Sequence, residues 1–254
     1  MSQPAAELVL LLHGQPGGAR DWDRVCAVVG DRARMVAIDR PGWRSGTLPT
    51  SLAGNAADAM SVLDAYGANH ATVVGHSLGG AVAAWLAADY PERVARLVLA
   101  APAANCASLV PLDYWLARPW LGELIGAPVL AGAGLALGVE AVRSLVARRL
   151  GLEERYLETM GRQLLRPPAW RAFAADQRAL VRDLPALEAR LERISAPTTI
   201  VAGSADRIVP LSSAQALARS IRGAQLVVLA GGDHLLVQRD PERLAEIIVE
   251  RANG

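Results

Sequence analysis

Six short aliphatic runs alternate with longer stretches of helical periodicity along most of this chain. Each run is bounded by turn residues and is almost continuously apolar, as expected for parallel strands that helices cover on both faces. The alternation predicts an α/β fold with a mostly parallel sheet of about six strands flanked by helices. The predicted strands are residues 8–12, 34–38, 71–75, 96–101, 198–203 and 225–230, and the predicted helices are residues 21–29, 51–66, 77–90, 186–194, 212–221 and 241–252.

Residues 105–184 interrupt this alternation, because they contain helical patterns and no convincing strand. They also hold several aromatic residues, including the only Phe of the chain, Phe173. We therefore expect a helical lid (residues 105–184) over the carboxyl edge of the sheet, where ligands bind in open α/β sheets. Residues 1–104 and 185–254 then form the core. The apolar character of the lid favours a hydrophobic substrate.

The charge balance limits the partners of the chain. Its 26 basic and 25 acidic residues give a formal net charge of +1, which argues against a general electrostatic contact with nucleic acid or an anionic membrane. We expect a small-molecule substrate instead. All 26 of these basic residues are Arg and none is Lys, so a lysine Schiff base and a P-loop lysine are excluded. No Cys/His cluster has metal-ligand spacing and no Gly-rich loop matches a nucleotide fingerprint, so we expect neither a metal nor a cofactor.

No targeting or membrane-spanning pattern stands out. The apolar run 8–12 lacks a basic flank and continues into His13, so it predicts a core strand rather than a signal peptide. The uncharged stretch between Glu123 and Glu140 contains four glycines and is shorter than the ~18 residues that a span requires. Two cysteines are too few for a disulfide framework and indicate a reducing compartment, so we expect a cytoplasmic protein.

The segment Gly75-His76-Ser77-Leu78-Gly79 fits the pattern Gly-x-Ser-x-Gly. An aliphatic strand precedes it and an Ala-rich helix follows it, which is the context of a nucleophile elbow. Glycines at the flanking positions let the strand and the helix approach closely around a strained, exposed serine. The pattern predicts that Ser77 is a catalytic nucleophile. The alternative is a Gly-rich turn that contains an incidental serine.

A serine hydroxyl needs a base to take its proton, and the base needs an acid to orient it. His234 follows the last predicted strand at the carboxyl edge and completes the chain order Ser, Asp, His, so we predict that it is the base. The side chain of His76 should point away from Ser77. We expect His70 at the surface and His13 as a brace for a loop.

Asp206 directly follows the strand 198–203 and is the predicted acid. Asp113 is the second choice, and Asp39 is interpreted as a turn residue. An oxyanion hole also requires two N–H groups that face the developing negative charge. Leu78, next to the nucleophile, should supply one of them. The loop His13-Gly14-Gln15-Pro16-Gly17 should supply the other from Gln15, because Pro16 has no N–H.

These segments resemble the α/β-hydrolase superfamily, in the branch with a His-Gly-x-Pro-Gly oxyanion loop and a Gly-His-Ser-Leu-Gly-Gly elbow. The resemblance covers nearly the whole chain apart from the lid and includes Asp39-Arg40-Pro41-Gly42. It implies the α/β-hydrolase fold, a helical cap and catalysis without a metal. Members of the superfamily include esterases, lactonases, cofactor-free perhydrolases, C–C bond hydrolases and thioesterases.

The sequence departs from this pattern in two places. The turn Gly42-Trp43-Arg44-Ser45-Gly46 is one residue shorter than in similar sequences, which changes the shape of a loop on the pocket side. Seven residues precede the first strand, so we expect the leading β-hairpin of the family to be missing. Strand 34–38 would then be an exposed edge that can pair with another chain. A homodimer through this edge is a hypothesis.

Together, the residues and the resemblance predict a serine hydrolase that cleaves a carboxylic ester or related acyl bond of a small, hydrophobic substrate through an acyl-enzyme on Ser77. C–C bond hydrolysis and cofactor-free perhydrolysis are the alternatives within enzymes. Epoxide hydrolysis and dehalogenation are disfavoured, because family members that catalyse them have Asp at the position of Ser77. A non-catalytic ligand-binding protein on the same scaffold is the alternative of another class.

Overall fold

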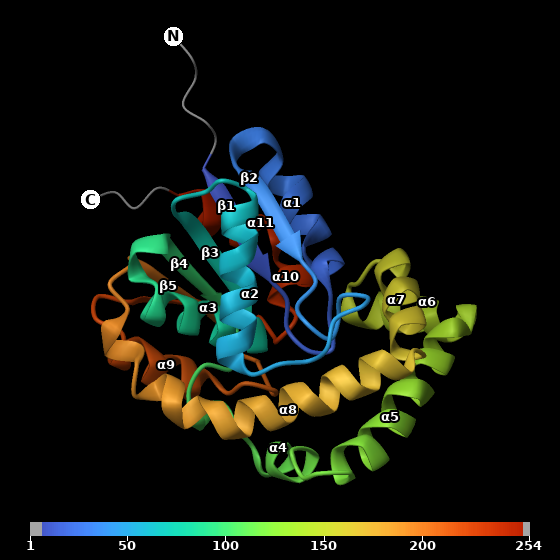
Figure 1. Cartoon of the computed structure of the whole chain (residues 1–254). Coiled ribbons are helices and arrows are strands. Elements are labelled where there is room, and N and C mark those ends of the chain that lie inside the picture. Colours follow the sequence, from blue (N-terminus) through green and yellow to red (C-terminus); the bar gives the residue numbers. More distant parts are fainter. Residues whose placement is uncertain (1–6, 251–254) are drawn as a thin grey trace.

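Six parallel strands form one sheet in the order β2-β1-β3-β4-β5-β6 (Figure 1). The computed structural model describes residues 7–250. The arrangement confirms the predicted six-stranded sheet, which is parallel throughout. The strands are β1 Leu8–Leu12, β2 Arg34–Ile38, β3 Ala71–His76, β4 Val94–Ala100, β5 Thr198–Gly203 and β6 Gln225–Leu229.

Helices cover both faces of this sheet, so its central strands are buried on each side. In β1 the side chains of Leu10 and Leu12 enter one apolar cluster, and those of Val9 and Leu11 enter another. The first cluster includes residues of α2, α3 and α9, and the second includes residues of α1 and α11. The helices that flank the sheet are α1 Asp23–Val29, α2 Leu52–Ala65, α3 Leu78–Asp89, α9 Leu211–Ser220, α10 Leu236–Arg239 and α11 Pro241–Val249.

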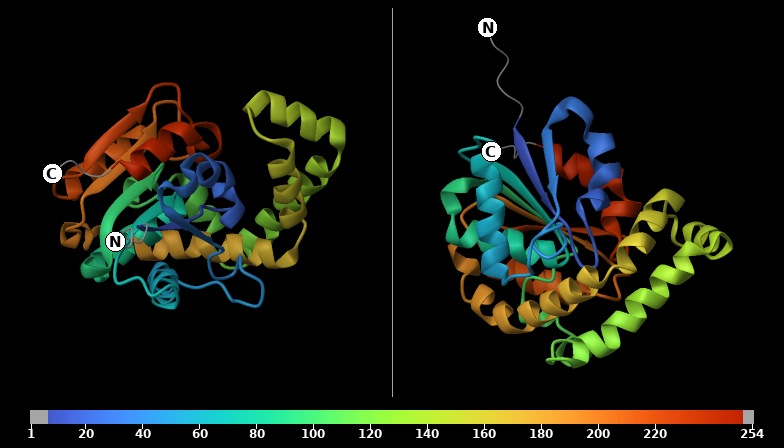
Figure 2. Two further views of the ribbon diagram at one scale, coloured as in Figure 1. Left: turned by 90° about the horizontal axis from the view of Figure 1, so that it is seen from above. Right: turned by 45° about the vertical axis from the view of Figure 1, so that its right-hand side comes forward.

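The segment 105–184, which we expected to be a lid, contains helices only within the described residues. The long helix α8 crosses beneath the carboxyl ends of the strands, and α5 runs alongside it (Figures 1 and 2). Helices α6 and α7 continue from α5 at the far end of α8 (Figure 2). The division into core and lid stays a prediction. The helices of this segment are α4 Pro111–Leu116, α5 Leu121–Gly138, α6 Glu140–Leu150, α7 Glu154–Leu164 and α8 Pro167–Glu188.

The predicted helix 186–194 was wrong in both of its limits. Helix α8 runs from Pro167 to Glu188 without interruption, and a short 3₁₀ helix follows at Leu191–Arg193. Pro185 suggests a helix start in the sequence, because proline favours the first turn. In the structure it lies inside α8, where the flanking Leu184 and Leu187 are completely buried in the core. This packing outweighs the one backbone hydrogen bond that the proline removes.

Helix α5 is long and apolar enough to cross a membrane, as judged by length and composition alone. Its 18 residues have a mean hydropathy of 1.5. The helix begins before the uncharged stretch identified in the sequence and includes Glu123, which forms an ion pair with Arg178 of α8 at 2.8 Å. One such helix is weak evidence for a membrane span, because apolar helices of soluble proteins meet the same criteria.

Strand β2 lies at one edge of the sheet, as expected, and pairs only with β1. Its residue Val36 is buried, whereas Arg34 is exposed. The edge carries unpaired backbone groups of the kind that another strand can bind. A homodimer through β2 stays a hypothesis.

Candidate active site

Ser77 occupies a strained turn between β3 and α3. Its φ of 53° and ψ of −121° lie in a region that residues with side chains rarely adopt. The flanking glycines make this turn possible: a Cβ on Gly75 would overlap the backbone of Gly79, and a Cβ on Gly79 would overlap the carbonyl of Leu12. The backbone of Ser77 is fixed by its N–H, which donates to the carbonyl of Ala100 at 3.0 Å. The turn has the geometry of a nucleophile elbow.

The structure brings Ser77, His234 and Asp206 together in one hydrogen-bonded chain. The Nε2 of His234 lies 3.0 Å from the Oγ of Ser77, and the Nδ1 of His234 lies 2.8 Å from Oδ2 of Asp206. An ionised carboxylate only accepts hydrogen bonds, so Nδ1 carries the proton and donates a hydrogen bond to Asp206. The lone pair of Nε2 then faces the Ser77 hydroxyl. This is the tautomer that a general base requires.

Asp206 is held as a carboxylate at this position. Burial alone would raise the pKa of Asp206. The hydrogen bond and the charge of His234 oppose this effect, as do the hydrogen bonds from the N–H groups of Val209 and Ile208, and the pKa lies below its ordinary value. The two backbone groups donate to Oδ1 at 2.9 and 2.8 Å, and Oδ2 is left for His234. Only 2% of the Asp206 side chain is exposed, so water does not compete for these bonds.

Of the other histidines, His13 and His70 lie where they were expected, and His76 packs beside the ring of His234. His13 is buried and braces the loop that follows β1: its Nε2 accepts the N–H of Arg40 at 3.0 Å, and its Nδ1 lies 2.7 Å from the carbonyl of Gly14. His76 lies beside the base, and its Nε2 is 2.9 Å from the carbonyl of His234. Burial and, to a smaller extent, His234 lower the pKa of His76 to about 3, so its ring is neutral. His70 is exposed.

The alternative acids make other contacts. Asp113 caps α4, where its Oδ2 accepts the N–H of Val110 at 2.8 Å, and its Oδ1 accepts a hydrogen bond from Gln177 at 3.0 Å. Asp39 accepts the N–H of Ala19 at 2.7 Å, which fits the interpretation of Asp39 as a turn residue. Of the three carboxylates, it is Asp206 that accepts the hydrogen bond from Nδ1 of His234.

The two residues predicted as oxyanion donors belong to segments that pack near Ser77, and their role stays a prediction. Leu78 begins α3, and the first N–H groups of a helix have no partner within it. Gln15 follows Gly14, and a Cβ built on Gly14 would lie 2.9 Å from the Cβ of Ser77. Within residues 7–250, no backbone acceptor binds the N–H of Gln15. The loop that carries the Gln15 N–H therefore packs closely against Ser77, and the Leu78 N–H belongs to the residue that follows Ser77.

Sequence reasoning missed a buried ion pair behind this loop. Arg40 and Asp176 are each 1% exposed and lie 2.9 Å apart, and the indole N–H of Trp43 donates to the same carboxylate at 2.8 Å. The run Asp39-Arg40-Pro41-Gly42 is visible in the sequence, but it does not identify a partner for Arg40. That partner lies 136 positions away in α8, and no local pattern connects the two residues.

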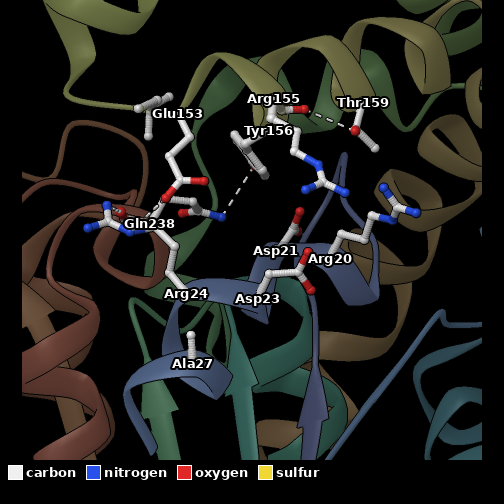
Figure 3. Close-up of a pocket in the computed structure, with 11 residues that line it drawn as sticks. Arg20, Asp21, Asp23, Arg24, Ala27, Glu153, Arg155, Tyr156, Thr159 and Gln238 are labelled. Carbon is white, nitrogen blue, oxygen red and sulfur yellow. Dashed lines mark hydrogen bonds and ion pairs between the residues drawn. The ribbon is translucent and has the colours of Figure 1, made fainter. Parts of the chain in front are cut away.

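A separate cavity of about 270 Å³ lies between α1 and α7, and the three residues of the Ser–His–Asp chain do not line it (Figure 3). Asp21 is one of the residues that line this cavity. Burial raises the pKa of Asp21 to about 7, and this effect exceeds the opposing hydrogen bonds from the Gly18 N–H and the Tyr156 hydroxyl. Asp21 is thus a buried carboxyl group whose charge changes near neutral pH.

Comparison with known proteins places this arrangement in a family. A 2-hydroxy-6-oxononadienedioate/2-hydroxy-6-oxononatrienedioate hydrolase of Burkholderia vietnamiensis is 28% identical over 96% of this chain and 86% of its own length. A monoacylglycerol lipase of Xenopus laevis is 27% identical over 95% of this chain and 74% of its own length. The crystal structure of a hydrolase from Pseudomonas aeruginosa PA01 matches with a TM-score of 0.76 and 26% identity, over 97% of this chain and 91% of that one. Since the model of the alpha/beta hydrolase family also matches residues 9–247, the chain belongs to that family.

Proposed function

We propose that this chain is a serine hydrolase that cleaves a carboxylic ester or a related acyl bond through an acyl-enzyme on Ser77. The observation that carries the proposal is the continuous hydrogen-bonded chain from Ser77 through His234 to Asp206, with contacts of 3.0 and 2.8 Å. Neither the strained backbone of Ser77 nor the buried carboxylate of Asp206 is required by the packing of an ordinary loop. Both are expected at a nucleophile and its orienting acid.

In the proposed reaction, Ser77 Oγ attacks the substrate carbonyl while Nε2 of His234 takes the hydroxyl proton. The N–H groups of Gln15 and Leu78 stabilise the negative charge that develops on the carbonyl oxygen. His234 then gives its proton to the leaving alcohol as the C–O bond breaks. A water molecule repeats the sequence on the acyl-enzyme, with His234 again as the base, and releases the acid and free Ser77.

The substrate that we propose is small and hydrophobic. The lid contributes aromatic and aliphatic side chains, several of them exposed, including Tyr114, Trp115 and Trp120. Apolar walls with a few polar groups are typical of sites that bind acyl chains or rings. The monoacylglycerol lipase among the relatives is named for an ester substrate of this kind, which supports the assignment.

C–C bond hydrolysis is the second candidate, because the Burkholderia relative is named for a 2-hydroxy-6-oxo dienedioate. The named compound has no ester or amide bond, so its hydrolysis must break a bond between two carbon atoms. The Ser–His–Asp chain is compatible with both reactions. What differs is the leaving group, which is an alcohol for an ester and a carbanion equivalent for the dienedioate.

A substrate panel with matched serine variants tests the proposal. The panel contains short aryl esters of increasing acyl length, lactones and a 2-hydroxy-6-oxo dienoate. We expect the wild-type protein to turn over the esters with the highest kcat/KM, and Ser77→Ala to lose that activity. Ser61→Ala is the control, because Ser61 is on the exposed surface of α2 and bonds only to the carbonyl of Ala57.

Three results would contradict the proposal in different ways. Hydrolysis that persists in Ser77→Ala would place the nucleophile elsewhere. A higher kcat/KM for the dienoate than for every ester would favour the C–C bond hydrolase. A wild-type protein that binds a small ligand, but neither turns over the panel nor reacts with a fluorophosphonate, would indicate a non-catalytic binding protein.

A further inference from the structure

The loop that carries Gln15 packs directly against the nucleophile. A Cβ built on Gly14 would lie 2.9 Å from the Cβ of Ser77 and 3.1 Å from the Nδ1 of His76. The absence of a side chain on Gly14 lets the loop approach Ser77 this closely, so a shift of the loop would change where the Gln15 N–H lies relative to Ser77. Reacting groups that are misplaced by about 1 Å can lose about 10²-fold in rate. Whatever holds this loop in place therefore affects the proposed reaction.

The guanidinium of Arg40 holds the loop from behind. Its Nε donates to the carbonyl of His13 at 2.9 Å, and one terminal nitrogen donates to the carbonyl of Gly14 at 2.9 Å. The remaining donors bind the side chain of Asn55 at 3.3 Å and both carboxylate oxygens of Asp176, at 3.3 and 2.9 Å. Arg40 is 1% exposed, so these protein groups replace water. Asp176 of α8 therefore sets the orientation in which Arg40 meets the two carbonyls.

Gln177, the next residue of α8, holds the same loop from another direction. Asp113 is a carboxylate and only accepts hydrogen bonds, so the amide nitrogen of Gln177 faces it at 3.0 Å. The amide oxygen of Gln177 then faces the Nε2 of Gln15 at 2.6 Å. Gln177 is 4% exposed, and its amide is fixed at both ends. The side chain of Gln15 is thereby tied to α8.

We propose that Asp176 and Gln177 are positioning residues that hold the loop of residues 13–17, and with it the Gln15 N–H, against Ser77. This inference rests on the proposed function, because the role of Gln15 as an oxyanion donor is assigned there. The two residues do not touch the reacting atoms. Asp176 acts through Arg40 on the backbone of the loop, and Gln177 acts on the side chain of Gln15. One helix of the lid thus sets the geometry of the oxyanion hole.

A displaced loop should affect kcat and KM differently. A displaced N–H loses contact with the oxyanion of the transition state, whereas binding of the neutral ester is nearly unaffected. Loss of α8 contacts should therefore lower kcat and leave KM within about threefold. Complete loss of an oxyanion donor typically costs about 10²–10³ in kcat. A donor that is displaced but still present should cost less, on the order of tenfold.

The test uses Asp176→Asn and Gln177→Met in the full chain. Asp176→Asn removes the charge that orients Arg40, and Gln177→Met removes both amide contacts without leaving a buried charge unpaired. The control is Arg178→Met, which is the next residue of α8 and breaks only the ion pair with Glu123 of α5. Active sites are counted by fluorophosphonate labelling to completion, so that kcat is expressed for each reactive site and unfolded protein is excluded.

Two measurements are made on each variant: the steady-state kinetics of a short aryl ester, and the inhibition constant of an aryl trifluoromethyl ketone. The ketone carbon bonds to Ser77 Oγ, the hydroxyl proton passes to His234, and the ketone oxygen becomes the anion that the N–H groups bind. We expect kcat for each site to fall about tenfold or more in Asp176→Asn and about threefold or more in Gln177→Met. The ketone should bind more weakly by the same factors, and Arg178→Met should stay within twofold.

The outcomes separate this inference from the proposed function. If wild-type protein is not labelled and does not turn over the ester, the proposed function fails, and this inference fails with it. If wild-type protein is active and both variants keep its kcat for each site and its ketone affinity, only the positioning role is wrong. An equal loss in Arg178→Met would also overturn it, since general loosening of the lid would explain the data. If Asp176→Asn does not fold, Gln177→Met decides the question.

Discussion

Asp206→Asn is predicted to move the ring proton of His234 to the wrong nitrogen. In the structure the N–H groups of Ile208 and Val209 both donate to Oδ1 of residue 206, at 2.8 and 2.9 Å. An Asn side chain must keep its oxygen at that position, because its NH₂ group cannot accept hydrogen bonds. The NH₂ group then points at Nδ1 of His234, which becomes the acceptor. The ring proton moves to Nε2, and that nitrogen can no longer take the proton of Ser77.

The expected loss follows from this tautomer change. In the Ser–His–Asp template, replacing the acid by its amide leaves the geometry intact and lowers kcat about 10⁴-fold. At 1.36 kcal/mol for each tenfold change, this corresponds to about 5.4 kcal/mol of transition-state stabilisation. Stability should change little, because the two backbone hydrogen bonds to Oδ1 survive the substitution. The alternative orientation of the amide would set NH₂ against two N–H donors, which disfavours it.

The assay measures initial rates of aryl-ester hydrolysis for wild type, Asp206→Asn and the control Asp113→Asn. Circular dichroism and thermal unfolding establish that each variant is folded. We expect Asp113→Asn to stay within about tenfold of wild type, since Asp113 contacts Gln177 and the Val110 N–H rather than His234. A loss of less than about tenfold in folded Asp206→Asn, or a loss of about 10⁴-fold in Asp113→Asn, would refute the reasoning.

Two further predictions concern buried charges. Arg40→Met leaves the carboxylate of Asp176 buried without its partner. We therefore expect the free energy of unfolding, measured by urea titration, to fall by about 3–5 kcal/mol. A fall of less than about 1 kcal/mol would contradict the burial of this ion pair. The pKa of Asp21 is raised to about 7, so its proton stabilises the fold fully below pH ~4, and this contribution is lost as the pH rises through about 7. Relative to wild type, Asp21→Asn should therefore be more stable at pH 8 than at pH 5, by about 2.6 kcal/mol. Parallel pH dependences of the free energy of unfolding in the two proteins would show that Asp21 is not the responsible group.

The elements that the sequence predicts well are those encoded by neighbouring residues. The six strands are continuous aliphatic runs, and the elbow around Ser77 is one pentapeptide between a strand and a helix. Asp206 and His234 could be selected because each follows a strand at the carboxyl edge. Their chain order then limits the choice among the acids and histidines.

Contacts between distant segments could not be predicted in this way. Arg40 and Asp176 are separated by 136 positions, and nothing in either local sequence indicates the other. The extent of α8 was mispredicted, because tertiary packing carries the helix through Pro185 to Glu188. Of these two features, the Arg40–Asp176 pair is the one on which the proposed positioning of the Gln15 loop rests.

The site of covalent labelling tests most directly whether Ser77 is the nucleophile. Wild-type protein and Ser77→Ala are treated with a fluorophosphonate, digested, and mapped by tandem mass spectrometry. We expect one adduct on the wild-type protein, located on Ser77, and no adduct on the alanine variant. An adduct on any other residue, or ester turnover by a wild-type protein that carries none, would contradict the assignment of Ser77 as the nucleophile.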